Sequence, residues 1–216
     1  MDSKVIIAKR AAQELKDGFV VNLGIGIPTL AVDYLPQGVH VILHSENGFV
    51  GLAPLAGPVD PDLTNAGAAP VSIVAGGAMF DSATSFALIR GGHIDATVLG
   101  GLEVDQEGNL ANWMVPGKIV PGMGGAMDLV SGAKEVIIAM EHTDKKGNAK
   151  ILKKCTLPLT GKGVVTRIIT NLGVFSASKR GLVLEELAPD VSLEEIMQKT
   201  EADFVVSEAL RTMAID

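Results

Sequence analysis

The chain has 216 residues, of which 47% are hydrophobic and 20% are charged, a composition typical of folded proteins and not of disordered ones. Its formal charge of −7 comes from 25 acidic and 18 basic residues with no basic stripe or tail, so no nucleic-acid partner is expected. The single cysteine, Cys155, excludes an internal disulfide and a cysteine-based zinc cluster, and it indicates a reducing compartment.

The length predicts a single domain over residues 1–216. Charged side chains interrupt residues 1–18, which therefore do not have the pattern of a signal peptide, and no apolar run has the length of a membrane span. We therefore expect a cytoplasmic protein with no membrane contact. Glycine is frequent, at 25 residues, which favours an α/β fold with glycine-rich loops at its strand ends.

The start of the chain predicts half of a βαβ unit. A short amphipathic helix is expected from its cap at Ser3 to Gly18, followed by an apolar strand that ends at Leu23. The loop Gly24-Ile25-Gly26 then leads into a helix that starts near Pro28. A second strand is expected at Val39–His44.

Strands and helices alternate along the rest of the chain. The expected elements are, in order, a turn at Asn47-Gly48, a surface loop over Ala53–Pro70, a strand at 71–77, a helix capped by Asp81 or Ser82, a strand that begins near Asp95, a helix that starts near Met127, a central strand at 134–142, and helices at Val164–Ile169 and Ser192–Lys199. This alternation predicts an α/β fold with an open, mostly parallel sheet and helices on both faces. Ligands of such folds bind at the carboxyl ends of the strands.

Glu46 lies at one of these strand ends. It follows an apolar strand and precedes Asn47-Gly48, whose glycine lets a ligand approach closely. The residues support two interpretations. Glu46 is either a catalytic carboxylate or an incidental glutamate in a hairpin turn, since Asn-Gly forms such turns by itself.

Two glycine loops, residues 23–29 and 121–128, lead from extended chain into expected helices. Backbone N–H groups at such positions bind anions or oxyanions, although neither loop has a complete phosphate-binding or dinucleotide-binding motif. The alternative is that the glycines only allow close packing. The four histidines form no metal-binding pair with a nearby acid, and the nucleophile elbow of serine hydrolases is missing, so neither a metal site nor a catalytic serine is expected.

The segment LHSENGFVG, residues 43–51, resembles the signature around the active-site glutamate of family I coenzyme A (CoA) transferases. Further segments resemble this family in the same order: VNLGIGIPT, DLTNAG, MFDSATSFALIRGGHID, GNLANWMVPGK, GMGGAMDLV and KCTLPLTG. The length and the start of the chain resemble the free-standing β subunit of acetate and 3-oxoacid (acetoacetate, butyrate) CoA-transferases.

This resemblance implies the CoA-transferase superfold, which sugar isomerases share, and a catalytic role for Glu46. Its carboxylate would carry CoA as a covalent glutamyl thioester between an acyl-CoA and a carboxylic acid. The residues implied in CoA binding are Gly24, Gly26, Gly124, Gly125 and Ala126. The resemblance also implies that no cofactor is permanently bound, and that a separate α subunit completes the active site in a heterodimer or heterotetramer.

Two positions depart from the family pattern. Gly76–Phe80 replaces a proline-containing version, and Glu103 stands where many members have Gln. The extra negative charge of Glu103 lies either near the expected site or on a face away from it. Two other functions stay open, a sugar-phosphate isomerase of the related fold and a non-catalytic subunit, although the Glu46 signature favours the transferase.

Overall fold

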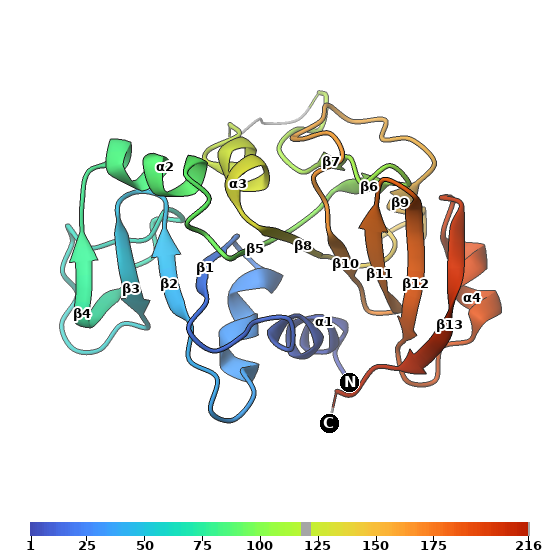
Figure 1. Cartoon of the computed structure of the whole chain (residues 1–216), viewed down its shortest axis with the longest axis horizontal. Coiled ribbons are helices and arrows are strands. Elements are labelled where there is room, and N and C mark those ends of the chain that lie inside the picture. Colours follow the sequence, from blue (N-terminus) through green and yellow to red (C-terminus); the bar gives the residue numbers. More distant parts are fainter. Residues whose placement is uncertain (118–121, 216) are drawn as a thin grey trace.

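The computed structural model describes residues 1–117 and 122–215. Ten strands from both halves of the chain form one open sheet, in the order β13-β12-β11-β10-β8-β5-β1-β2-β3-β4 (Figure 1). These strands are β1 (Val20–Leu23), β2 (Ile42–Ser45), β3 (Phe49–Ala53), β4 (Ser72–Met79), β5 (Ala96–Leu99), β8 (Glu135–Ala139), β10 (Arg167–Ile169), β11 (Gly173–Ser178), β12 (Gly181–Leu187) and β13 (Phe204–Thr212). A separate sheet contains β6 (Glu103–Asp105), β7 (Leu110–Ala111) and β9 (Ile151–Leu152).

The five central strands, β2, β1, β5, β8 and β10, run parallel to one another. Antiparallel strands flank them, with β3 and β4 beyond β2, and β11 and β12 beyond β10, while β13 is again parallel to β12. The predicted open, mostly parallel sheet is therefore confirmed. Because β1, β2 and β5 are parallel neighbours, the segments that follow Leu23, Ser45 and Leu99 meet at one edge of the sheet.

Helices cover both faces of the sheet, as predicted, with α2 and α3 on one side and α1 and η1 on the other (Figure 1). In β8, Val136 and Ile138 pack with α2 and α3, whereas Ile137 and Ala139 pack with α1. Successive side chains of a strand point to opposite faces, so the four apolar residues from Val136 to Ala139 require a layer on each side. The helices are α1 (Ser3–Ala12), the 3-10 helix η1 (Ile27–Tyr34), α2 (Ser82–Arg90), α3 (Ala126–Gly132) and α4 (Leu193–Lys199). Within the two described ranges, none of them is long and apolar enough to cross a membrane.

The first helix differs from its prediction at both ends. Asp2, and not Ser3, caps it: the Asp2 carboxylate accepts a backbone N–H of the first turn at 2.9 Å, while Ser3 Oγ donates to Glu141 at 2.6 Å. The helix ends at Ala12, six residues before the position expected. Gly18 instead forms a later turn with φ of +78°.

Two other predictions need correction. The segment predicted as a helix at Val164–Ile169 contains β10, in which Ile168 and Ile169 are fully buried in different core clusters. A short apolar run carries helix and strand signals alike, and the neighbouring strands β8 and β11 decide between them. The helix expected near Pro28 is the 3-10 helix η1, and β2 begins at Ile42 instead of Val39.

A buried carboxylate joins α1 to the far half of the sheet. Glu186 of β12 is 2% exposed and accepts hydrogen bonds from Arg10 of α1 (2.6 and 3.0 Å) and from Arg211 of β13 (2.6 and 3.0 Å). Burial raises the pKa of Glu186, but the bonds and charges of the two arginines outweigh it and hold the pKa below its usual value. Arg10 also pairs with Glu14 at 2.6 Å.

Removal of this carboxylate is expected to destabilise the fold strongly. Glu186→Ala leaves the buried Arg10 guanidinium without its bidentate partner, at a cost of about 3 kcal/mol or more in the free energy of unfolding. Urea denaturation measures this cost, with Glu208→Ala on the exposed face of β13 as the control. Equal midpoints for the two variants would contradict this role.

His142 is a second buried polar group. Its ring nitrogens lie 2.9 Å from Thr170 Oγ1 and 2.9 Å from Thr200 Oγ1, and it is fully buried. Burial, together with the charges of Lys199 and Lys150, lowers its pKa to about 4. The unfolded chain binds a proton at this side chain near the usual pKa of about 6.5, so stability falls as the pH drops from that value toward 4.

His142→Gln is expected to remove this pH dependence. For the wild type, His142 accounts for a loss of about 2 kcal/mol in the free energy of unfolding between pH 7 and pH 5, and the variant lacks that loss. Urea titrations at both pH values measure it. His40→Asn is the control, because the His40 side chain is 88% exposed, and it should keep the wild-type difference. An unchanged difference in His142→Gln would disprove the assignment.

Candidate active site

Glu46 lies in the tight turn between β2 and β3, at the carboxyl end of β2. The backbone N–H of Gly48 donates to the carbonyl of Ser45 at 3.0 Å, which closes the turn that Asn47-Gly48 predicted. Gly48 has φ of +137°, and a Cβ at this position would lie 2.2 Å from the carbonyl oxygen of Phe80. Only glycine fits here, so close packing fixes the turn that carries Glu46.

A buried amide holds the Glu46 side chain. Asn22 of β1 is 2% exposed, and its Nδ2 donates to Glu46 Oε2 at 3.0 Å. Asn22 Nδ2 also lies 3.3 Å from His44 Nδ1, while His44 Nε2 lies 2.9 Å from Ser85 Oγ of α2. Burial lowers the pKa of His44, although the charge of Glu46 opposes the shift. We therefore assign a neutral ring whose Nδ1 accepts from Asn22 and whose Nε2–H donates to Ser85.

The start of α3 packs directly on Glu46. A Cβ added to Gly125 would lie 3.1 Å from Glu46 Cγ and 3.4 Å from Phe86 Cζ, so the backbone of Gly125 touches the glutamate side chain. Gly124 has φ of +55°, a left-handed conformation that favours glycine. The Ala126 N–H is already engaged, since it donates to the carbonyl of Met123 at 3.3 Å. The structure thus brings the second glycine loop to the predicted carboxylate.

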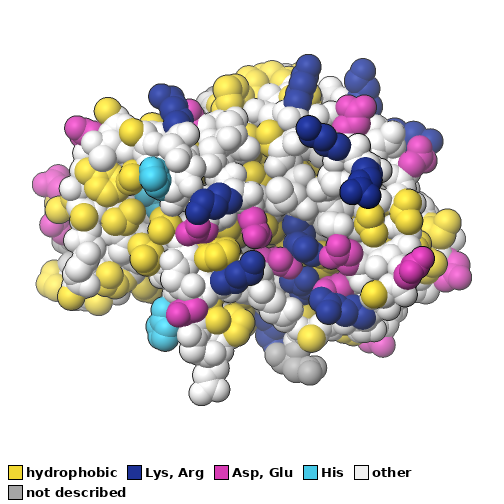
Figure 2. All heavy atoms as spheres, viewed as in Figure 1, with side chains coloured by type: hydrophobic (Ala, Val, Ile, Leu, Met, Phe, Trp, Pro, Cys, Tyr) yellow, Lys and Arg dark blue, Asp and Glu magenta, His cyan; other side chains and the backbone are white. Residues whose placement is uncertain are grey.

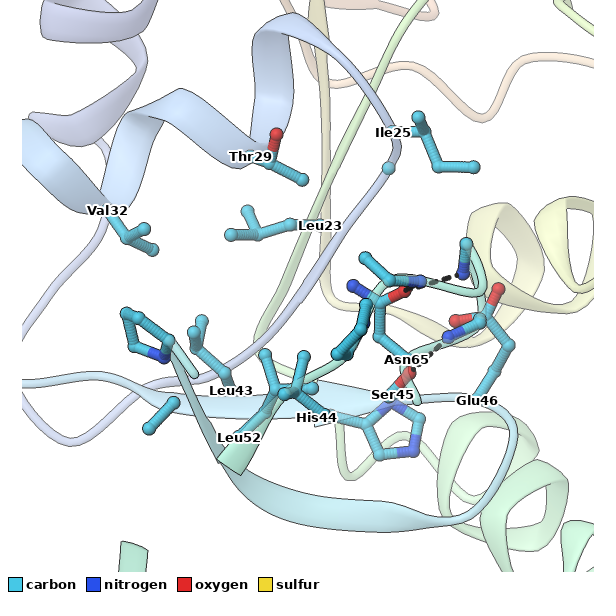
Figure 3. Close-up of a pocket in the computed structure, with 18 residues that line it drawn as sticks. Leu23, Ile25, Thr29, Val32, Leu43, His44, Ser45, Glu46, Leu52 and Asn65 are labelled. Atoms are coloured by element: carbon cyan, nitrogen blue, oxygen red, sulfur yellow. Dashed lines mark hydrogen bonds between the residues drawn. The ribbon is translucent and has the colours of Figure 1, made fainter. Parts of the chain in front are cut away.

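A cavity of about 270 Å³ opens beside Glu46 (Figure 3). Gly24 lines it, whereas Gly26, with φ of +94° at the start of η1, is not among the described residues of its wall. Figure 3 shows Glu46 at one end of the cavity and apolar side chains at the other. The apolar lining consists mainly of Leu23, Ile25, Val32, Leu43, Leu52 and Val71.

Residues 65–71 form one wall of this cavity. Ser45 Oγ accepts the N–H of Ala66 at 3.0 Å, and Asn47 Nδ2 donates to the carbonyl of Thr64 at 2.7 Å, so the wall is tied to the hairpin of Glu46. Asn65 Oδ1 accepts two N–H groups of its own loop at 2.9 and 3.0 Å. The sequence predicted a surface loop over Ala53–Pro70, and did not predict that its second half shapes the site.

Asn22, His44 and Ser85 were not predicted at the site either. A signal for Asn22 existed, because it is the one polar residue of β1, whose other residues are Val20, Val21 and Leu23. A buried amide in an apolar strand needs hydrogen-bond partners and therefore marks a polar site.

Glu103 and Cys155 lie apart from the Glu46 cavity. The Glu103 carboxylate accepts from the N–H and Oγ1 of Thr156, both at 2.7 Å, and from the N–H of Leu157 at 3.0 Å, so it braces a loop. Burial raises the pKa of the Cys155 thiol to about 12, with the charges of Asp105 and Glu103 adding to the effect. This thiol is protonated at neutral pH and is a poor nucleophile. Among residues 1–117 and 122–215, no group of His, Cys, Asp and Glu side chains is placed to hold a metal.

Comparison with known proteins gives consistent matches. The family model of coenzyme A transferase matches residues 4–199. The chain is 60% identical to the β chain of the acetate CoA-transferase of Haemophilus influenzae, over 100% of this chain and 97% of that protein. It is also 53% identical to the mitochondrial succinyl-CoA:3-ketoacid coenzyme A transferase 2A of Rattus norvegicus, over 96% of this chain but only 41% of the rat protein.

A solved structure supports the same assignment. The acyl-CoA transferase apoenzyme of Escherichia coli O157:H7 superposes with a TM-score of 0.78 at 26% identity, and the match covers 99% of this chain and 44% of that chain. The sequence resemblance, the open sheet and the full-length similarity to relatives therefore agree, and this chain belongs to the coenzyme A transferase family.

Proposed function

We propose that the chain transfers CoA between a short-chain acyl-CoA or 3-oxoacyl-CoA and a carboxylic acid, as the β subunit of an α/β complex with Glu46 as nucleophile. One observation carries the proposal: Glu46 lines the cavity, and its Oε2 is held by Asn22 at 3.0 Å. The names of the relatives, an acetate CoA-transferase and a succinyl-CoA:3-ketoacid CoA-transferase, support the substrate class.

Transfer proceeds through two covalent species. The Glu46 carboxylate attacks the thioester carbonyl of the acyl-CoA, and the C–S bond breaks to give an acyl-glutamyl anhydride and the CoA thiolate. The thiolate then attacks the Glu46 carbonyl carbon and releases the carboxylate of the first acid. A glutamyl-CoA thioester remains, and the incoming acid runs the same steps in reverse to leave as the new acyl-CoA. CoA is thus substrate and covalent intermediate, with no cofactor permanently bound.

A carboxylate suits this exchange better than a hydroxyl. The free energies of hydrolysis of an acyl-carboxylate anhydride and of a thioester are comparable, so neither intermediate is too stable to react further. An ester formed at a serine would be more stable than a thioester and would slow the return of CoA. The glutamyl thioester must also be protected from water. The wall formed by residues 65–71 and the start of α3 supports this protection, because the wall is bonded to Ser45 beside Glu46 and α3 packs on Glu46 itself.

Each addition step creates an oxyanion that needs hydrogen-bond donors. We assign this role and contact with CoA to the backbone of Gly124, Gly125 and Ala126, where one well-placed donor is worth about 3 kcal/mol of barrier. Gly124 and Gly125 are the better placed of the three, since the Ala126 N–H already donates to Met123. Gly24 contacts the ligand from the cavity wall, and Gly26 shapes the loop that precedes η1.

Two rival functions fit the site less well. A sugar-phosphate isomerase needs cations for the phosphate group, and none of the described residues that line the cavity is Lys or Arg. A non-catalytic subunit would not require a carboxylate held by a buried amide next to a cavity. We further propose that the α subunit supplies the rest of the active site, so that the isolated chain folds but does not turn over.

Trapping the covalent intermediate tests Glu46. Acetoacetyl-CoA is added to the α/β complex without an acceptor acid, and mass spectrometry of the digest is expected to find CoA on the peptide that contains Glu46. Glu46→Gln abolishes the adduct because an amide cannot act as the nucleophile. Glu107→Gln, at an exposed position, keeps it. CoA found on Cys155 or on no peptide would rule out the mechanism.

Replacement of Asn22 tests whether its hydrogen bond to Glu46 is needed for activity. Asn22→Asp keeps the shape but places a second carboxylate beside Glu46, and kcat/KM at pH 7 is expected to fall about 100-fold. The activity of this variant is expected to recover partly at lower pH. One proton is then shared between Glu46 and the new carboxylate beside it, and this proton restores a hydrogen bond between the two groups. Asn171→Asp is the control, because Asn171 Oδ1 accepts the N–H of His142 and Asn171 is not among the described residues that line the Glu46 cavity. Wild-type rates in Asn22→Asp would contradict the role.

A further inference from the structure

A row of buried polar side chains crosses the centre of the sheet beneath α2. In the strand registers, Asn22 of β1 pairs with His44 of β2 on one side and with Thr97 of β5 on the other. Residues at the same level of neighbouring parallel strands point to the same face, so the three side chains lie next to one another. All three are buried, and His44 bonds to Ser85 of α2. The row therefore lies in the interior, between the sheet and α2.

The Thr97 hydroxyl differs from the rest of the row. It is fully buried, and its Oγ1 has no hydrogen-bond partner among residues 1–117 and 122–215. In Figure 2, by contrast, Lys and Arg side chains at the surface lie next to Asp and Glu side chains, where water also solvates them. A buried hydroxyl without a partner destabilises a fold, and valine has nearly the same shape without this cost. Packing in the free protein therefore does not explain a threonine at this position.

Asn22 is the polar neighbour of Thr97 across the sheet. On its other side Thr97 pairs with Val136 of β8, which is apolar. The Nδ2 atom of Asn22 is engaged toward β2, by Glu46 Oε2 at 3.0 Å, His44 Nδ1 at 3.3 Å and the His44 carbonyl at 3.4 Å. Because β1 lies between β2 and β5, Thr97 stands on the opposite side of Asn22 from these groups. Rotation about χ1 exchanges the positions of the Thr97 hydroxyl and methyl groups, so the hydroxyl has more than one direction in which to donate.

We propose that Thr97 is a positioning residue for CoA transfer, whose hydroxyl donates to Oδ1 of Asn22 while Glu46 reacts. The inference rests on the Glu46 nucleophile proposed above. Oδ1 is the acceptor end of the amide, and a donor at this end keeps the amide oriented with Nδ2 toward Glu46. Donation to Oδ1 also polarises the amide, which strengthens the hydrogen bond that Nδ2 donates.

The charge on Glu46 explains when this hydrogen bond matters. In the free protein the carboxylate divides its negative charge between two oxygens. With Oε2 engaged by Asn22, Oε1 is the attacking oxygen, and Oε2 becomes the carbonyl oxygen of the anhydride. When the CoA thiolate adds to the Glu46 carbonyl carbon, Oε2 takes the full charge, and it becomes a carbonyl again as the C–O bond breaks and the first acid leaves as a carboxylate. Stronger donation by Nδ2 thus stabilises the tetrahedral state more than the free protein, which raises kcat.

Removal of the hydroxyl tests Thr97 in the α/β complex, with acetoacetyl-CoA and acetate as substrates. Thr97→Val is expected to lower kcat about 10-fold with KM unchanged, because the lost hydrogen bond forms only as Glu46 reacts. The urea midpoint of the same complex should equal or exceed that of the wild type, since the hydroxyl has no partner among the described residues. Thr97→Ser retains the hydroxyl and should keep kcat within about twofold of the wild type.

Thr166→Val is the matched control, with the opposite expected result. Thr166 Oγ1 accepts the N–H of Val136 at 3.0 Å and donates to its carbonyl at 2.9 Å, and Thr166 is not among the described residues that line the Glu46 cavity. This variant loses hydrogen bonds of the free protein, so its urea midpoint falls while kcat keeps the wild-type value. A double variant tests the route through Asn22. In the Asn22→Ala background, which lacks Oδ1, Thr97→Val should have no further effect on kcat.

Three results would overturn the inference. The first is a wild-type kcat for Thr97→Val, the second is a lowered urea midpoint that Thr97→Ser restores, and the third is a loss of kcat that persists in the Asn22→Ala background. The CoA adduct on Glu46 separates this inference from the proposed function. If the wild-type complex forms the adduct and Thr97→Val keeps the wild-type kcat, this inference alone fails. A wild-type complex without the adduct refutes the Glu46 mechanism, whatever the kinetics of the Thr97 variants.

Discussion

The hydrogen bond from Asn22 Nδ2 to Glu46 Oε2, at 3.0 Å, connects two parallel neighbouring strands where both end. It orients the carboxylate so that Oε2 is hydrogen-bonded to the amide, while Oε1 is the oxygen that would face a ligand. The amide is itself fixed by His44 and, through it, by Ser85 of α2. The orientation of the Glu46 carboxylate therefore depends on the packing of a helix against the central sheet, and not on the turn alone.

Close backbone contacts impose a second constraint on the site. Gly48 lies against the carbonyl of Phe80, and Gly125 lies against Glu46 itself. A side chain at Gly48 would clash with the Phe80 backbone, and a side chain at Gly125 would press on the Glu46 side chain. Such contacts leave the Glu46 side chain little conformational freedom, which in the proposed mechanism reduces the entropy lost when the carboxylate reaches the reactive geometry.

The sequence predicted the sheet class, the turn at Asn47-Gly48 and the helix after Ser192, because each depends on local pattern or residue type. The residues alone left two interpretations of Glu46 open, and the family resemblance favoured the catalytic one. The bond to Asn22 was not predicted, because it depends on the register between β1 and β2. The helix predicted at Val164–Ile169 was wrong for the same reason, since neighbours distant in sequence determine β10.

The irregular pairing of β4 has a consequence for how copies of this chain meet. Strand β4 lies at an edge of the sheet and carries no charged side chain, and a flat apolar edge of this kind would pair with other copies and form aggregates. The register between β3 and β4 shifts between Val50 and Leu52, and this bulge interrupts the regular ladder that such growth requires. The bulge therefore protects the β4 edge in the way that a charged residue protects other edge strands.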